Sequence, residues 1–172
     1  MNIAIVGCGL IGQKRAKTLG NCKLLACVDP LIEKAEAIAQ QHVNCIALTQ
    51  WQEIINRDDI HIVIIATPHN ILSEIGVAAL TARKHILIEK PAGRNAAELD
   101  LLITASNKTE ALARVGFNHR YHPAFLKARA LVDQGALGEL MFIRARYGHG
   151  GRIGYDKEWR AKPERAGGGE LL

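Results

Sequence analysis

Three glycines near the N-terminus constrain the fold more than any other feature of this chain. Residues 7–12 read G-C-G-L-I-G, which is the spacing G-x-G-x-x-G. The apolar, β-branched residues 3–6 precede this turn, and residues 13–19 have the pattern of a helix. A strand, a tight turn and a helix in this order are typical of the unit that binds a dinucleotide.

Each glycine of this turn has its own physical task. Gly7 permits the sharp turn, Gly9 lets the backbone approach a pyrophosphate closely, and Gly12 lets the helix pack on the strand. The phosphates are then expected at the free N–H groups of the helix N-terminus, around Leu10 and Ile11, where the helix dipole is positive.

An acidic residue supports the same interpretation. A second expected strand, residues 23–28, ends in Asp29. An acid at this separation from the glycines accepts hydrogen bonds from the hydroxyl groups of the adenosine ribose. It would repel a 2′-phosphate, and Pro30 follows with no arginine at that turn, so NAD is favoured over NADP. A purely structural turn without a ligand is the alternative.

Strands and helices are expected to alternate over the rest of the first 117 residues. Further helices are expected at residues 31–41, 49–56 and 69–82 and from residue 95 through at least residue 103. Further strands are expected at 44–48, 61–66, 84–88 and 111–117. Thr49 is expected as one N-cap, and Asn95 as another in a capping box with Glu98. Six strands separated by helices predict the α/β class, with a doubly wound, mostly parallel Rossmann sheet.

The pattern changes beyond the sixth expected strand. Pro123 suits the first turn of a helix that ends near residue 135. Residues 140–147 alternate between apolar and polar side chains, which predicts a half-exposed strand of a mixed or antiparallel sheet. One such strand is not a domain. We therefore expect a dinucleotide-binding domain over residues 1–120 and the incomplete start of a second α/β domain over residues 121–172.

Composition narrows the class of protein. The 172 residues are 48% apolar, which suffices for a folded core. The net charge is +5, but the basic residues are scattered, so nucleic acid is not an expected partner. No apolar run has the length of a membrane span and no signal peptide is evident, so a cytoplasmic protein is expected. The four cysteines lack C-x-x-C spacing and are expected to be reduced core residues without a metal.

The ligand-binding edge of an open parallel sheet lies at the carboxyl ends of its strands. Three further segments directly follow expected strands: residues 67–69 (T-P-H), 89–91 (E-K-P) and 118–120 (N-H-R). Lys90 lies beside a carboxylate and before a rigid proline. Its ammonium group could bind the oxygen on the carbon that loses a hydride. A solvated surface lysine is the alternative.

Five segments together resemble one known family: residues 3–12, 66–68 (A-T-P), 84–91 (K-H-I-L-I-E-K-P), 115–118 (V-G-F-N) and 167–171 (G-G-G-E-L). They are similar to the glucose–fructose oxidoreductase and inositol dehydrogenase family, Gfo/Idh/MocA. The glycine motif is generic, whereas E-K-P at this separation from it is more specific. The resemblance implies an NAD(P)-dependent oxidoreductase that transfers a hydride from a secondary alcohol of a sugar, nucleotide sugar or cyclitol. It also implies that the full-length protein is a homo-oligomer.

The resemblance assigns roles to individual residues. Lys90 is implied to be a catalytic residue that contacts the nicotinamide ribose and the substrate. The Lys90–Pro91 bond is implied to be cis, and Glu89 is implied to orient Lys90 or the ribose. Trp159 and Arg160 resemble a pair that closes over the cofactor in some members; a packed tryptophan beside a solvated arginine is the alternative. The cofactor-binding residues implied are Gly7, Gly9, Leu10, Ile11, Gly12, Asp29, Thr67, Pro68, Glu89, Lys90, Asn118, Trp159 and Arg160.

The sequence also departs from the family pattern. Ser73 lies where the family often has a histidine. In the family, the G-G-G-x-L segment leads to an aspartate and a general acid/base histidine, whereas this sequence ends at Leu172. We therefore expect an N-terminal fragment that binds NAD with little or no turnover. His119, His122 and His149 do not match that motif and are expected to be surface or packing histidines.

A second class of function shares the same features. A non-catalytic dinucleotide-binding or redox-sensing module would use the glycine motif and Asp29, but it gives residues 89–91 no task. A basic loop could favour an anionic substrate or could be a solvated run of charge. Its basic residues are Arg152, Lys157, Arg160 and Arg165.

Overall fold

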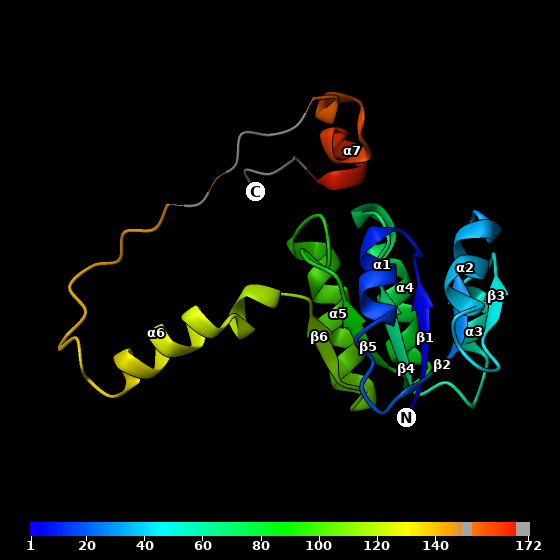
Figure 1. The fold of residues 1–172 in the computed structure, drawn as a ribbon, viewed down its shortest axis with the longest axis horizontal. Coiled ribbons are helices and arrows are strands. Elements are labelled where there is room, and N and C mark those ends of the chain that lie inside the picture. Colours follow the sequence, from blue (N-terminus) through cyan, green and yellow to red (C-terminus); the bar gives the residue numbers. More distant parts are fainter. Residues whose placement is uncertain (147, 149–152, 168–172) are drawn as a thin grey trace.

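The computed structural model describes residues 1–146, 148 and 153–167. Its centre is a six-stranded sheet in the order β3-β2-β1-β4-β5-β6 (Figure 1), and all neighbouring strands are parallel. The strands are β1 (Asn2–Val6), β2 (Lys23–Val28), β3 (Ile46–Leu48), β4 (Ile62–Ile65), β5 (His85–Ile88) and β6 (Ala113–Val115). The expected doubly wound Rossmann sheet is confirmed.

Helices alternate with these strands, as the apolar periodicity predicts. They are α1 (Leu10–Ala16), α2 (Ile32–Ala39), α3 (Gln52–Ile55), α4 (His69–Thr81) and α5 (Ala96–Thr109). After β6 come the helices α6 (Pro123–Asp133) and α7 (Pro163–Ala166) and the 3-10 turns η1 (Asn118–Tyr121), η2 (Tyr155–Lys157) and η3 (Trp159–Ala161). The strand order reverses at the β1–β4 pair. In open α/β sheets this reversal opens a crevice at the carboxyl ends of the strands, where ligands bind.

Two hydrophobic cores lie on the two faces of the sheet, because successive strand side chains point to opposite faces. Ile5 of β1 belongs to one core together with Ala16 of α1 and Ile38 of α2. Its neighbour Val6 belongs to the other core, together with Leu72 of α4. The apolar runs are therefore buried on both sides, which fixes the strand ends and the residues that follow them.

The two predicted N-caps have different outcomes. The side-chain oxygen of Asn95 accepts a hydrogen bond from the Glu98 N–H at 3.0 Å, as the capping motif predicts. The Glu98 carboxylate accepts from the N–H of Arg94 at 2.7 Å. The prediction for Thr49 is wrong, because the chain bends at Thr49 and α3 begins only at Gln52, with Trp51 as its N-cap and no side-chain cap.

The region beyond β6 agrees with prediction only in part. Helix α6 begins at Pro123, and the His122 ring accepts a hydrogen bond from the Ala124 N–H at 3.2 Å. The strand predicted over residues 140–147 is wrong for residues 140–146, which form no strand, and Tyr147 lies outside the described residues. A strand needs a partner, and no described segment pairs with this one. Its apolar side chains are exposed, with Met141 at 88%.

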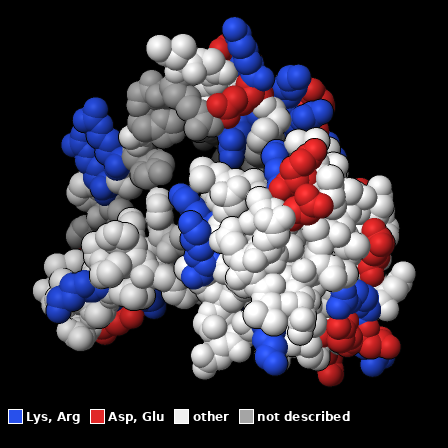
Figure 2. Space-filling model, turned by 45° about the vertical axis from the view of Figure 1, so that its right-hand side comes forward, with Lys and Arg blue, Asp and Glu red and all other residues white. Residues whose placement is uncertain are grey.

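Residues 153–167 return to the sheet edge above α4 (Figure 1). The Arg94 guanidinium donates a hydrogen bond to the Glu164 carbonyl at 2.7 Å. On the face of the molecule that Figure 2 shows, lysine and arginine side chains are spread among acidic ones rather than gathered in one patch. Among the described residues, no helix combines the length and apolar character that a membrane crossing needs.

Candidate dinucleotide and substrate site

The first turn leaves no room for side chains at two of its glycines. Gly7 has φ +93°, and a Cβ there would lie 2.5 Å from the Ala66 carbonyl oxygen and 2.9 Å from the Thr67 nitrogen. A Cβ on Gly12 would lie 2.0 Å from the carbonyl oxygen of Gly7. The turn after β1 therefore packs directly on the end of β4, and only glycine fits at these two positions.

The middle glycine faces open space. A Cβ on Gly9 would meet no described atom within 4 Å. Gly9 is the N-cap of α1, and no side chain among the described residues caps this helix. The first N–H groups of a helix need acceptors, so the N–H groups of Leu10 and Ile11 are available to an anion. The turn therefore fits the diphosphate of a dinucleotide.

Asp29 joins the ends of the first two strands. Its side chain is 8% exposed, and its oxygens accept hydrogen bonds from the N–H of Cys8 at 2.9 Å and of Leu31 at 3.0 Å. A carboxylate offers about four lone-pair sites, so it can still accept bonds from ribose hydroxyls. The structure thus places Asp29 beside the glycine turn, as the dinucleotide hypothesis requires.

The segment after β4 reaches the same edge. The Thr67 hydroxyl donates to the Pro68 carbonyl at 3.3 Å, and α4 begins at His69. Burial lowers the pKa of His69, the hydrogen bond to the Ala166 carbonyl opposes this, and the positive charges of Lys90 and Arg160 lower the pKa further. His69 is thus neutral near pH 7 and close enough to Lys90 to sense its charge.

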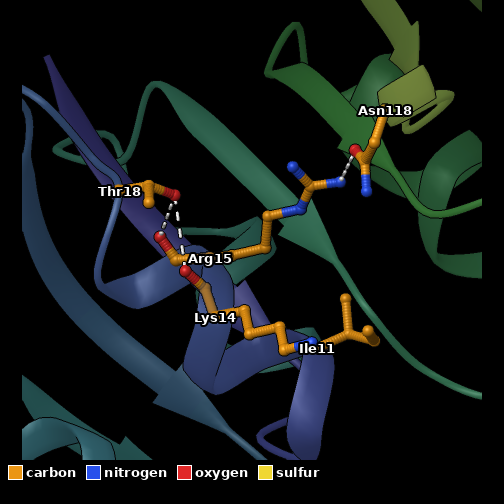
Figure 3. Close-up of a pocket in the computed structure, with 5 residues that line it drawn as sticks. All are labelled: Ile11, Lys14, Arg15, Thr18 and Asn118. Carbon is orange, nitrogen blue, oxygen red and sulfur yellow. Dashed lines mark hydrogen bonds between the residues drawn. The ribbon is translucent and has the colours of Figure 1, made fainter. Parts of the chain in front are cut away.

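A partly buried ion pair lies at the end of β5. The Arg15 guanidinium on α1 donates two hydrogen bonds to the Glu89 carboxylate, one of them from Nε at 2.8 Å. It also donates to the side-chain oxygen of Asn118 at 3.0 Å (Figure 3). A Cβ on Gly116 would lie 2.9 Å from the guanidinium and 3.0 Å from the carboxylate, so only glycine leaves room for this pair.

The sequence did not point to Arg15 or Gly116. Arg15 lies 74 positions from Glu89, and nothing local marks either residue as a partner of the other. The sequence does contain a signal that places both residues at one sheet edge. Arg15 comes three positions after Gly12, and the E-K-P glutamate directly follows a buried strand.

Lys90 directly follows Glu89 at the sheet edge and is exposed. Among the described residues its ammonium group has no hydrogen-bond partner, and the Lys90–Pro91 bond is cis, as the resemblance implies. Most lysine side chains are exposed, so exposure alone does not distinguish a functional lysine. Its place directly after Glu89, whose carboxylate is held by Arg15 on the helix of the glycine turn, does relate it to that turn.

Trp159 and Arg160 arrive at this edge from the distant segment 153–167. The rings of Trp159 and His69 meet edge to face, with centroids 4.7 Å apart. The Arg160 guanidinium carbon lies 4.5 Å from the centroid of the Trp159 ring. These ring and cation–π contacts hold both side chains beside the start of α4.

Comparison with known proteins decides the family. The family model "Oxidoreductase family, NAD-binding Rossmann fold", GFO_IDH_MocA, matches residues 1–117. The model of the GFO/IDH/MocA C-terminal domain matches residues 125–172. The chain belongs to the Gfo/Idh/MocA family. Its cofactor domain is therefore an NAD-binding Rossmann fold.

Several family members share much of this chain. Levoglucosan dehydrogenase of Pseudarthrobacter phenanthrenivorans is 28% identical over 158 residues, covering 86% of this chain and 40% of that protein. Inositol 2-dehydrogenase of Salmonella typhimurium is 26% identical over 153 residues, covering 86% and 46%. A structure of levoglucosan dehydrogenase with NADH has a TM-score of 0.85 at 26% identity, covering 99% of this chain and 50% of that one. The chain thus spans about half the length of these relatives.

The remaining polar candidates have structural roles in this Gfo/Idh/MocA chain. The buried Ser73 hydroxyl donates to the Glu98 carbonyl at 2.9 Å, which ties α4 to α5. His119 stacks on Phe125 with centroids 6.2 Å apart, and His149 lies outside the described residues. Among the described residues, no group of three or more metal-ligating side chains is placed to hold a metal ion.

A shallow groove of about 210 Å³ runs beside the Arg15–Glu89 pair. Its lining residues are Ile11, Lys14, Arg15, Thr18 and Asn118 (Figure 3). The Thr18 hydroxyl donates to the carbonyls of its own helix, at 3.4 and 3.3 Å. The groove therefore follows the outer face of α1 and ends at the residues that hold Glu89.

Proposed function

We propose that the whole protein is an NAD-dependent dehydrogenase that oxidises a secondary alcohol of a sugar or cyclitol. One observation carries this proposal. The ammonium group of Lys90, which has no hydrogen-bond partner in the described part of the chain, lies at the same sheet edge as the glycine turn, beside the partly buried pair of Glu89 and Arg15. The names of the family relatives, levoglucosan and inositol 2-dehydrogenases, support the substrate class.

The glycine turn and Asp29 would hold the cofactor. The first N–H groups of α1 would bind the diphosphate. Asp29 would accept hydrogen bonds from the ribose hydroxyls through the oxygen lone pairs that are not used by the N–H groups of Cys8 and Leu31. NAD supplies the acceptor for the hydride when it is bound. The negative charge of Asp29 at this position favours NAD over the phosphorylated cofactor.

Lys90 would act on the substrate. Its ammonium group would donate a hydrogen bond to the hydroxyl oxygen on the reacting carbon, and so stabilise the negative charge that develops there. Arg15 would keep Glu89 fixed, so that Lys90 leaves the sheet edge in one direction. Thr67, Pro68, Trp159 and Arg160 would line and cover the cofactor.

We also propose that residues 1–120 form the cofactor domain and that residue 121 begins a second domain. The matches to two separate family models, over residues 1–117 and 125–172, support this division. The exposed apolar residues Phe125 and Leu126 on α6 also support it, because the described residues leave them without a core. A homo-oligomer of the whole protein belongs to the same proposal.

Substitution of Lys90 in the complete protein tests the catalytic role. Lys90→Ala should lower kcat by about a hundredfold or more with a sugar or cyclitol, because it removes an interaction made mainly in the transition state. The NAD dissociation constant, measured by calorimetry, should change little. Lys34→Ala, which alters an exposed lysine on α2, is the control and should leave both quantities unchanged. Undiminished turnover by the Lys90 variant would refute the proposal, and a protein that binds NAD but oxidises no polyol would favour the sensor alternative.

A further inference from the structure

Two thiols lie close together on one face of the sheet. The sulfur atoms of Cys27 on β2 and Cys45 just before β3 are 3.7 Å apart, and both cysteines are free. Cys27 is opposite Ala47 in the parallel register. Cys45 lies two positions before Ala47, so its side chain points to the same face as that of Cys27.

The two thiols differ in exposure and in charge. Cys27 is fully buried, whereas Cys45 is partly exposed. The hydrogen bond from Cys27 lowers the pKa of Cys45, burial opposes this, and the positive charge of Arg57 lowers the pKa further. The same hydrogen bond, a second one with Cys8 and burial raise the pKa of Cys27. Of the two, Cys45 is therefore the more easily deprotonated and the more accessible to an oxidant.

This arrangement matches the requirements of a redox-active pair. The reactive form of cysteine is the thiolate, and oxidation selects thiols that are accessible, low in pKa and close to a second thiol. We propose that hydrogen peroxide converts Cys27 and Cys45 into a reversible disulfide, with Cys45 reacting first. This modification is separate from the proposed dehydrogenase activity and does not depend on it.

The chemistry balances with peroxide as the only oxidant. The Cys45 thiolate attacks one peroxide oxygen, the O–O bond breaks, and an S–O bond forms as hydroxide leaves. The Cys27 sulfur then attacks the Cys45 sulfur, so that an S–S bond forms and the S–O bond breaks. The Cys27 proton and the proton released from Cys45 convert the two hydroxides into water, and two electrons pass from the thiols to peroxide.

Peptide mapping of the native chain tests the proposal directly. Cleavage after lysine and arginine places the four cysteines on four different peptides, because basic residues separate all of them. After brief treatment with hydrogen peroxide and alkylation without reductant, we expect one cross-linked pair, residues 24–34 with residues 35–57. Two of the four thiols should be lost, and dithiothreitol should restore them. Retention of all four thiols, or a link through Cys8 or Cys22, would overturn the proposal.

Variants separate the roles of the two sulfurs. Cys45→Ser should abolish the cross-link, and Cys27→Ser should leave Cys45 as a sulfenic acid that dimedone traps. Cys22→Ser is the matched control, since Cys22 is also partly exposed, and it should cross-link as the parent does. The parent peptide map decides the question even where the buried Cys27→Ser chain does not fold. Dimedone labelling of Cys27 in place of Cys45 would reverse the assigned order and refute it.

Discussion

Arg15 and Glu89 join the helix of the glycine turn to the strand that presents Lys90. Their side chains are only 20% and 12% exposed, and the guanidinium also reaches Asn118 after β6. The Arg15 side chain thus holds three chain segments together at the sheet edge. Its consequence is that the diphosphate cradle and the proposed substrate lysine hold one relative position.

Removal of Arg15 should destabilise the fold. Arg15→Ala leaves the Glu89 carboxylate half-buried beside Gly116 without its counter-charge, so the free energy of unfolding in urea should fall by about 2 kcal/mol. Arg129→Ala is the control, because its pair with Asp133 on α6 is exposed at 75% and 53%, and surface pairs contribute less than about 1 kcal/mol. Equal losses in the two variants would contradict a structural role for Arg15.

Alanine at two glycines of the same turn should affect different properties, stability at Gly12 and NAD binding at Gly9. Gly12→Ala places a methyl group 2.0 Å from the Gly7 carbonyl, so it should cost about 3 kcal/mol of stability or more. Gly9→Ala meets no described atom and should change stability by less than about 1 kcal/mol. Its methyl group should instead keep a diphosphate from the helix N–H groups and weaken NAD binding about tenfold or more. Urea titration and calorimetry on both variants give the comparison, and unchanged NAD affinity in Gly9→Ala would place the diphosphate elsewhere.

Acid should destabilise the folded chain through His69. The folded pKa of His69 lies below its usual value of 6.5, so the folded chain binds fewer protons than the unfolded chain in the window below pH 6.5. The contribution of neutral His69 to the free energy of unfolding is therefore fully present above pH 6.5. It is lost as the pH falls through the folded pKa. His69→Gln should flatten the stability profile in the range below pH 6.5. A parent profile with no slope in this range would contradict the assignment.

Local patterns explain why much of the site could be predicted. The strand before Asp29 and the turn at Gly7 are specified by adjacent residues, since an apolar run and three glycines fix where the chain extends and where it bends. Asn95 was found for the same reason, because its capping partner is three positions away.

Contacts between distant segments explain what was missed. Arg15 and Glu89 are brought together by the order of the strands, and Cys27 and Cys45 by the pairing of β2 with β3. The wrong strand at residues 140–146 has the alternation of a strand, but pairing decides whether such a segment extends. Periodicity describes one segment and carries no information about its neighbour.

The double attachment of Asp29 bears on any attempt to redesign the cofactor preference. An exchange of this acid for a smaller or basic residue would accommodate an extra phosphate, but it would also deprive the Cys8 and Leu31 amides of their acceptor. A successful redesign must therefore supply a substitute acceptor for those two amides, and is expected to require at least one companion mutation near the loop after β2.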